Sequence, residues 1–273
     1  MNNTNVRTTV MAVIVVGMIL SPASGSVILE DLNSEVEFYL ASQDGLMRWT
    51  VDGLDHMQQQ WFWYRLGDSG PEQSIDALDL KVYKDTDGDL DPGNERLIAR
   101  YADANETFRI TLDFILTGGR DGSGVSDLAE VISIENTGSS TLDFHFFQYV
   151  DFDLRGDEHD TSVEIRGGNT AVQTDVGMGL SETVVTWKPD HYQVGYDDDI
   201  ISLLNDGDPT TLLDVAGALY DGNLTWAFQW DFELAPGQAF IISKDKNVVP
   251  EPTSLAVLAL GTFALLLHRR SRR

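Results

Sequence analysis

The sequence predicts an all-β fold, an antiparallel β-sandwich of the jelly-roll type or a larger sandwich. Apolar and polar residues alternate with a period of two over 107–114, 142–146 and 224–232, which is typical of strands with one face in a core. Turn sequences rich in glycine, asparagine and proline separate such segments, as at 136–138 and 235–237. Outside the two ends, no stretch longer than about ten residues has a helical stripe.

The other predicted strands are short segments rich in branched and aromatic residues, each bounded by turn residues. They span 27–32, 35–40, 46–51, 60–66, 78–84, 96–101, 129–135, 162–166, 183–187 and 239–243. The sequence contains no internal repeat and no low-complexity linker. We therefore expect one β-sandwich domain over residues 26–247.

The charge of the chain limits its partners. The 273 residues include 44 acidic and 18 basic side chains, and no cysteine. Residues 26–250 hold 43 of the acids and 13 of the bases, a net charge of −30. A field of this sign repels phosphate and anionic lipid, so we expect no nucleic-acid partner, and membrane contact only through the C-terminal tail. The lack of cysteine excludes disulfides, thiolate zinc sites and a cysteine nucleophile.

Residues 1–25 have the pattern of a secretory signal peptide. Arg7 precedes an apolar run over residues 10–20, and small residues follow at 21–25. Eleven apolar residues form too short a helix to span about 30 Å of hydrocarbon. We expect signal peptidase to remove this segment. An uncleaved core or amphipathic helix is the alternative.

The other end of the chain, residues 248–273, has three parts in a fixed order. Pro250, Glu251 and Pro252 form an extended segment that disfavours helix. A charge-free stretch over 255–267 follows, which predicts a short transmembrane helix. A basic cluster comes last, and the positive-inside rule places it in the cytoplasm. This cluster contains Arg269, Arg270, Arg272 and Arg273.

This tripartite tail resembles the PEP-CTERM sorting signal that bacterial exosortases read. The resemblance implies export across the inner membrane, transient anchoring there, recognition at Pro250-Glu251-Pro252 by an exosortase, and removal of the tail. It also implies a final place in the cell envelope or the extracellular matrix, with exopolysaccharide as a partner to consider. A single-pass anchor that is never cut is the alternative.

The sharpest internal motif is an acidic loop between two predicted strands. Four aspartates at two-residue spacing repel one another along an extended chain, and glycines and a proline let the chain curl around one cation with oxygen ligands. The loop resembles Asp-x-Asp calcium loops, although its glycine and glutamate spacing departs from the EF-hand. A solvated loop without metal is the alternative. The expected calcium ligands are Asp85, Asp87, Asp89, Asp91 and Glu95.

No residue is expected to be catalytic. The acidic segment 151–160 could hold an ion or supply paired carboxylates for glycoside chemistry, but spacing in sequence does not give their distance. No two of the five histidines have the i, i+2 or i, i+4 spacing of common metal motifs. The segment 197–199 is expected to be a solvent-exposed loop. A Gly-x-Ser-x-Gly elbow and a phosphate-cradling glycine loop are both missing.

The aromatic residues divide into two groups. The first lies on one face of a predicted strand and is expected in the core. It consists of Trp226, Phe228, Trp230 and Phe232. The second group lies on both faces of the strand near residue 60. Two interpretations compete for this group: a strand that is buried on both sides, or an exposed platform on which sugar rings stack. The platform would use Trp61, Trp63 and Tyr64.

These observations predict an exported, calcium-stabilised β-sandwich. It would be sorted to the cell envelope or the exopolysaccharide matrix and act there as a binding or structural module, not as an enzyme. The competing hypothesis is an exported carbohydrate-active enzyme that uses carboxylates of the acidic loops.

Overall fold

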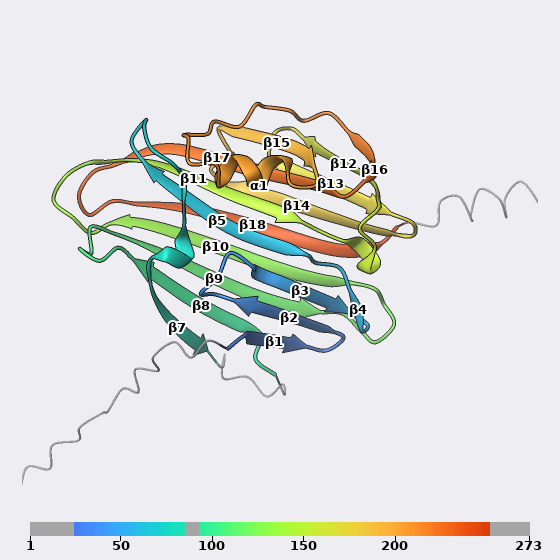
Figure 1. The fold of residues 1–273 in the computed structure, drawn as a ribbon. Helices are drawn as coiled ribbons and strands as arrows, with labels where there is room; N and C mark the ends of the chain where they lie inside the picture. Colours follow the sequence, from blue (N-terminus) through green and yellow to red (C-terminus); the bar gives the residue numbers. More distant parts are fainter. Residues whose placement is uncertain (1–24, 86–92, 252–273) are drawn as a thin grey trace, which may run out of the picture.

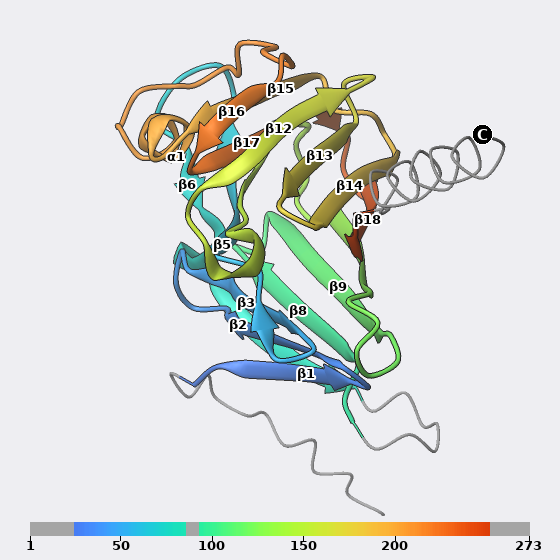
Figure 2. The ribbon, with the colours of Figure 1, turned by 90° about the vertical axis from the view of Figure 1, so that its right-hand side faces the viewer.

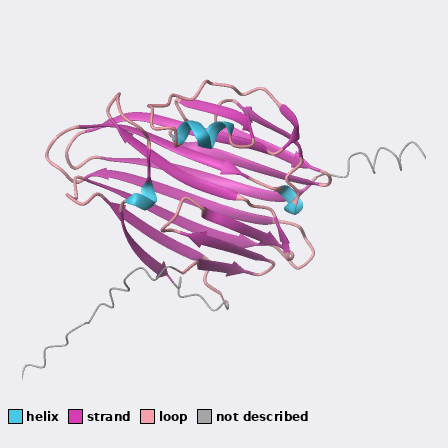
Figure 3. Cartoon of the chain, in the orientation of Figure 1, coloured by secondary structure: helices cyan, strands magenta, loops and turns pink. Residues whose placement is uncertain are grey.

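Two antiparallel β-sheets of nine strands each make up the described part of the chain. The computed structural model describes residues 25–85 and 93–251. Figure 1 shows the strands of the two sheets running across the molecule in stacked layers, and Figure 3 shows how little helix accompanies them. The helical elements are the 3₁₀ turns η1 (Ile75–Ala77) and η2 (Leu154–Gly156) and the helix α1 (Asp199–Leu204). The predicted all-β sandwich is therefore confirmed, and it is the larger kind.

The first sheet has the strand order β1-β2-β3-β5-β11-β17-β15, with β4 beside β3 and β6 beside β5. Its neighbouring strands are antiparallel except for a short parallel contact between β3 and β5. Its members are β1 (Val27–Asp31), β2 (Ser34–Tyr39), β3 (Gly45–Val51), β4 (Leu54–Asp55), β5 (Gln59–Leu66), β6 (Gln73–Ser74), β11 (Leu142–Asp151), β15 (His191–Tyr196) and β17 (Leu224–Leu234).

The second sheet has the order β16-β12-β13-β14-β18-β10-β9-β8-β7. Figure 2, turned by 90°, separates its two halves, with β12, β13 and β14 above β8 and β9. Its members are β7 (Asp79–Asp85), β8 (Arg96–Ala102), β9 (Phe108–Gly118), β10 (Ser126–Asn136), β12 (Asp160–Arg166), β13 (Thr170–Asp175), β14 (Met178–Thr186), β16 (Leu219–Gly222) and β18 (Ala239–Pro250).

The sequence analysis missed several elements in the C-terminal half. Strands β13, β15 and β16 were not expected, and β14 begins five residues before its predicted start. These segments mix polar and apolar residues, so their pairing partners rather than their own pattern place them in a sheet. The segment 197–199, expected to be a loop, leads into α1.

The boundary between the domain and the tail differs from the prediction. Strand β18 continues to Pro250, and Val248 is fully buried in the core. The folded domain therefore extends past residue 247 and includes the first residues of the predicted tail. Among the described residues, no helix is long and apolar enough to cross a membrane. The predicted signal peptide core and the predicted tail helix at 255–267 lie outside the described residues.

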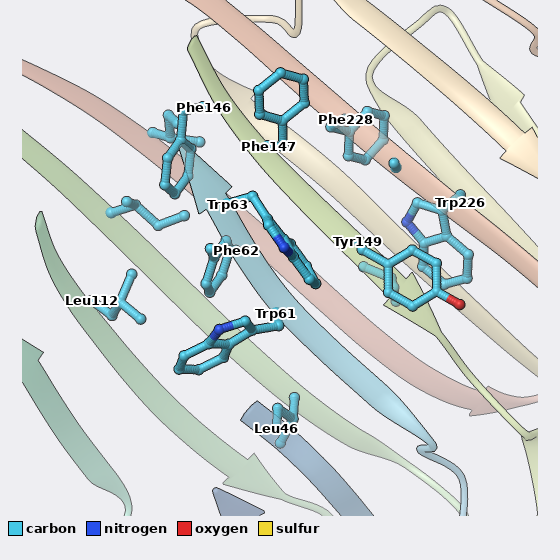
Figure 4. Packing of buried hydrophobic residues seen from close by; sticks show 14 of the residues in the cluster. Leu46, Trp61, Phe62, Trp63, Leu112, Phe146, Phe147, Tyr149, Trp226 and Phe228 are labelled. Atoms are coloured by element: carbon cyan, nitrogen blue, oxygen red, sulfur yellow. The ribbon is translucent and has the colours of Figure 1, made fainter. Parts of the chain in front are cut away.

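The core between the sheets is rich in aromatic rings. Figure 4 shows buried rings from both faces of the first sheet, among them Phe62, Phe146 and Trp226 of this core. Trp226, Phe228 and Trp230 are completely buried, as predicted. Phe232 is partly buried and stacks on the Phe240 ring at a centroid distance of 3.9 Å. The aromatic strand therefore supplies core packing rather than a surface for a ligand.

The face of the first sheet that points away from the second sheet is also covered. Segments 72–77 and 199–213 lie over it, and their polar groups meet the rings beneath: the Trp61 Nε1 donates to Ser74 Oγ at 2.8 Å, and the Trp63 Nε1 donates to Asn205 Oδ1 at 3.2 Å. Trp61, Trp63 and Tyr64 are all buried. The described structure therefore forms no sugar-stacking platform at these three residues, because rings enclosed on both faces are not accessible to a sugar.

An ionic cluster lies at the centre of the core. Glu130, Glu182, Lys244 and Lys246 are all fully buried. The Nζ of Lys244 is 2.8 Å from Glu130 Oε2, and the Nζ of Lys246 is 3.2 Å from Glu182 Oε1. Two acids and two bases leave the cluster neutral, which limits the cost of burying charge.

Candidate functional site: an acidic cleft

The predicted calcium loop lies at a real hairpin, but most of its ligands are outside the described residues. Strands β7 and β8 pair antiparallel with Asp85 opposite Arg96, so the segment between them connects neighbouring strands as expected. Glu95 directly precedes β8, and its carbonyl accepts a hydrogen bond from the Leu116 N–H at 2.8 Å. Asp87, Asp89 and Asp91 belong to the part that the structure does not describe. The calcium site therefore stays a prediction.

The second acidic segment forms one wall of an open cleft of about 600 Å³. The cleft lies where η2 leads into β12, beside the end of β13 and the edge strand β16. Four of its lining residues are aspartates, against a single arginine. The lining comprises Arg155, Asp157, His159, Asp160, Thr161, Asp175, Val176 and Asp221.

Local backbone geometry sets the positions of two of these residues. Arg155 in η2 and Asp221 in β16 have φ angles of 67° and 55°, in the left-handed region that side chains other than glycine seldom adopt. The Arg155 Nη1 donates to the carbonyl of Val176 at 2.6 Å, which ties η2 to the turn after β13. This contact holds Arg155 at the cleft despite an unfavourable backbone.

Asp160 is the most buried acid of the cleft, with 1% of its surface exposed. Burial, together with the nearby Asp153 carboxylate, raises the pKa of Asp160 to about 8. Both carboxyl oxygens of Asp160 are buried, so this group lies behind the surface of the cleft rather than on it. Asp175 is also buried and accepts a hydrogen bond from Thr161 Oγ1 at 3.2 Å.

Two further acids of the segment 151–160 lie close to the cleft without lining it. Burial and the Asp153 carboxylate raise the pKa of Asp151 to about 7, and burial with Glu158 raises the pKa of Asp153 to about 6. The Tyr149 hydroxyl reaches Asp151 Oδ2 at 3.4 Å. Several carboxyls with raised pKa values beside one cleft are typical of functional sites.

The sequence analysis found one wall of this site and missed the others. Asp157, His159 and Asp160 fall in the segment that it singled out. Asp175 and Asp221 come from strands that it did not expect, and no spacing in the sequence connects them to Asp160. The one feature of the sequence that could indicate these two residues is their position, since each lies at the end of a short strand beside a glycine turn.

A family model gives direct evidence on the tail. Residues 248–273 match the PEP-CTERM protein-sorting motif. The chain carries a PEP-CTERM sorting signal. Such a signal implies exosortase as the processing partner, export with transient anchoring in the membrane, and then a place in the cell envelope or outside the cell. The PEP-CTERM resemblance of the tail is therefore confirmed.

Solved structures give evidence on the fold. A bacterial glucoamylase complexed with acarbose matches with a TM-score of 0.59 at 14% identity, covering 85% of this chain. The chain spans about a third, 32%, of that enzyme's length. The Slr1438 protein from Synechocystis sp. PCC 6803 matches with a TM-score of 0.56 at 13% identity, covering 84% of this chain and 97% of its own.

A putative aldose 1-epimerase from Escherichia coli K12 has a TM-score of 0.50 at 12% identity, covering 83% of this chain and all of its own. At such identities the likeness shows the fold alone. A comparison with curated proteins found no match.

Proposed function

We propose that the β-sandwich domain is a saccharide-binding module of the cell envelope or exopolysaccharide matrix, and that the acidic cleft is its binding site. The observation that carries this proposal is the cleft itself: an open volume of about 600 Å³ lined mainly by aspartates, with one arginine. Carboxylates accept hydrogen bonds from hydroxyl groups, and the exposed Arg155 guanidinium adds donors. Such a mixture suits the hydroxyls of a sugar.

The charge of the cleft indicates which saccharides fit. Four aspartates face one arginine, in a chain whose net charge is −26. Uronic acid polymers would be repelled, whereas neutral sugars carry no charge to repel. The ligand we propose is therefore a neutral oligosaccharide or a neutral stretch of exopolysaccharide. The likeness of the fold to a glucoamylase that was solved with acarbose supports a saccharide, but it names no sugar.

Titration with neutral oligosaccharides tests this proposal. We expect calorimetry to detect binding of neutral gluco-oligosaccharides, with weaker binding of alginate fragments of equal length. Asp157→Asn alters an exposed residue of the cleft and should weaken binding at least tenfold. Asp208→Asn, an exposed acid away from the cleft, is the matched control and should leave binding unchanged. Equal affinities for the Asp157 variant and the wild type would contradict the proposal.

A second candidate function is hydrolysis of the bound saccharide, favoured by one observation. A general acid requires a raised pKa, and burial raises the pKa of Asp160, next to the cleft, to about 8. Incubation with the same oligosaccharides and measurement of new reducing ends separates the two functions. Release that disappears in Asp160→Asn, while the variant stays folded by circular dichroism, would favour the enzyme. Binding without release favours the module.

A further inference from the structure

A second group of functional side chains lies at the other end of β11, at the border of the covered face of the first sheet. His145 on β11 is directly opposite Asp231 on β17. Asp143 lies two residues earlier on the same face of β11, and Asp68 lies on the loop after β5. With about 3.3 Å per residue, Asp143 is about 26 Å along the strand from Asp151. This group is therefore separate from the acidic cleft.

The His145 ring is held in one orientation. Its Nδ1 lies 2.6 Å from Asp231 Oδ1. The Gln229 Nε2 donates to both oxygens of the same carboxylate, at 2.8 and 3.1 Å, and His191 Nε2 is 3.6 Å from its Oδ2. A carboxylate that accepts from Nδ1–H leaves the lone pair of a neutral imidazole on Nε2.

The other ring nitrogen faces two more carboxylates. The Nε2 of His145 is 4.0 Å from Asp68 Oδ1 and 3.9 Å from Asp143 Oδ1, and the three atoms lie within 4.8 Å of one another. The Nε2 atom is buried, and among the described residues it has no hydrogen-bond partner. His145 as a whole is 9% exposed.

This arrangement is unfavourable unless a positive charge lies between the three groups. A buried lone pair that points toward two carboxylates is desolvated and repelled. We propose that His145, Asp68 and Asp143 bind a divalent transition-metal cation, with Asp231 as the residue that positions the imidazole. A carboxylate that accepts from the far nitrogen is the usual support for a histidine that ligates a metal.

The ligand set and its spacing indicate the class of metal. One imidazole nitrogen and two carboxylate oxygens suit zinc and its first-row neighbours, whereas calcium prefers oxygen alone. Ligands about 2.1 Å from a tetrahedral zinc ion lie about 3.4 Å apart, so each carboxylate oxygen needs to move about half an ångström closer to the His145 Nε2. Asp68 can do this freely, since its side chain is 97% exposed. Three protein ligands leave a coordination position open to water or another small ligand.

Zinc titration of the full chain tests the proposal. The protein is stripped with chelator and titrated calorimetrically with Zn²⁺ in the presence of excess Ca²⁺, which occupies sites built from oxygen alone. The wild-type protein should bind one zinc ion, and Asp68→Asn should lower the affinity for this ion at least tenfold. Asp68→Asn replaces a solvated carboxylate by an amide of the same shape, so the fold should stay intact. Asp208→Asn is the matched control and should bind as wild type does.

Two further variants test the geometry. His145→Gln should abolish binding of this zinc ion. Asp231→Asn should lower the zinc affinity by roughly 10- to 100-fold, the range for residues that support a ligating histidine. Co²⁺ should give visible absorption bands in wild type that His145→Gln removes. Binding that is absent in wild type, or equal in wild type and Asp68→Asn, overturns the proposal.

Discussion

Pro250 lies directly opposite Met178 in the second sheet, and the next backbone N–H, that of Glu251, donates to the Gly177 carbonyl at 2.9 Å. The sorting motif therefore begins where the sheet ends, with no linker between them. The sequence analysis expected Pro250 in an extended segment, and here that segment is the end of β18, where a proline is tolerated as the terminal residue of a strand. The folded domain holds the first part of the motif that exosortase must recognise.

This relationship predicts where the mature protein ends. Strand β18 lies between β14 and β10, and its Val248 is buried, so a cut before Val248 would remove part of a central strand. We expect intact-mass analysis of the protein from its native host to show loss of the tail after about Pro250. A mature species that still contains Arg273 would contradict this prediction, and so would a folded species that ends before Val248.

The aromatic core predicts a large loss of stability on truncation. Trp230 is completely buried between the sheets, so Trp230→Ala should lower the free energy of unfolding by about 3 to 5 kcal/mol. Denaturant unfolding measures the change. Leu213→Ala, at a side chain that is mostly exposed, is the control and should change stability by less than about 0.5 kcal/mol. Similar values for the two variants would mean that Trp230 is not packed as described.

The buried ionic cluster predicts an equally large loss of stability when one of its charges is removed. Lys246→Met leaves the fully buried Glu130 and Glu182 with a single cation. Removing one partner of a buried pair costs about 3 to 5 kcal/mol, because the remaining charge stays buried. Lys81→Met removes an exposed lysine and should have little effect on the urea midpoint. If both variants unfold at the wild-type midpoint, the cluster is solvated rather than buried.

The sequence could predict the sandwich, the aromatic core and the sorting signal because each leaves a local pattern. Alternation of period two is visible in β9 and β17, and Pro250-Glu251-Pro252 is a contiguous motif. The candidate sites leave no such pattern. Asp160, Asp175 and Asp221 come from three different strands and line one cleft. His145 and Asp68 are far apart in the sequence, and the pairing of β5 with β11 brings them together. Spacing rules search for ligands on one element, so they could not find either group.

The pH dependence of stability follows from the raised pKa values near the acidic cleft. The pKa values of Asp160 and Asp151, about 8 and about 7, lie well above their ordinary value of 3.8. Between pH 4 and pH 8 the folded protein holds protons that the unfolded chain has released, so stability falls as pH rises through this window. His56, whose pKa burial lowers to about 4, has the opposite effect below pH 6.5.

The prediction is therefore tested by measuring the free energy of unfolding at pH 6.5 and at pH 8.5, where His56 has little effect. A chelator is present at both pH values to remove metal ions. We expect the free energy of unfolding to fall by about 1 to 3 kcal/mol over this range, since each retained proton contributes about 1.4 kcal/mol per pH unit. Asp160→Asn cannot titrate and should flatten the dependence, whereas Asp208→Asn should not. A wild-type stability that is constant or rises from pH 6.5 to pH 8.5 would show that Asp151 and Asp160 are ionised in the fold.

The last prediction concerns the loop between β7 and β8. Asp85, Asp87, Asp89 and Asp91 place four negative charges within seven residues of a domain that is already strongly acidic. Without a cation these carboxylates repel one another and oppose the compact state. A cation that binds only the folded protein stabilises it by RT ln(1 + [L]/Kd), about 2.7 kcal/mol at a hundredfold excess over Kd. We therefore expect millimolar calcium to raise the melting temperature and chelator to lower it.

A variant of the loop separates this site from other acidic groups. Asp87→Ala should lose most of the response to calcium, because it removes one of the central ligands that we predict. Asp208→Ala, at an exposed acid outside the loop, should keep the full response. Zinc binding at His145 does not interfere when the melting curves are recorded with calcium as the sole added metal. If the wild type and Asp87→Ala melt at the same temperature with and without calcium, the loop is a solvated turn and holds no metal.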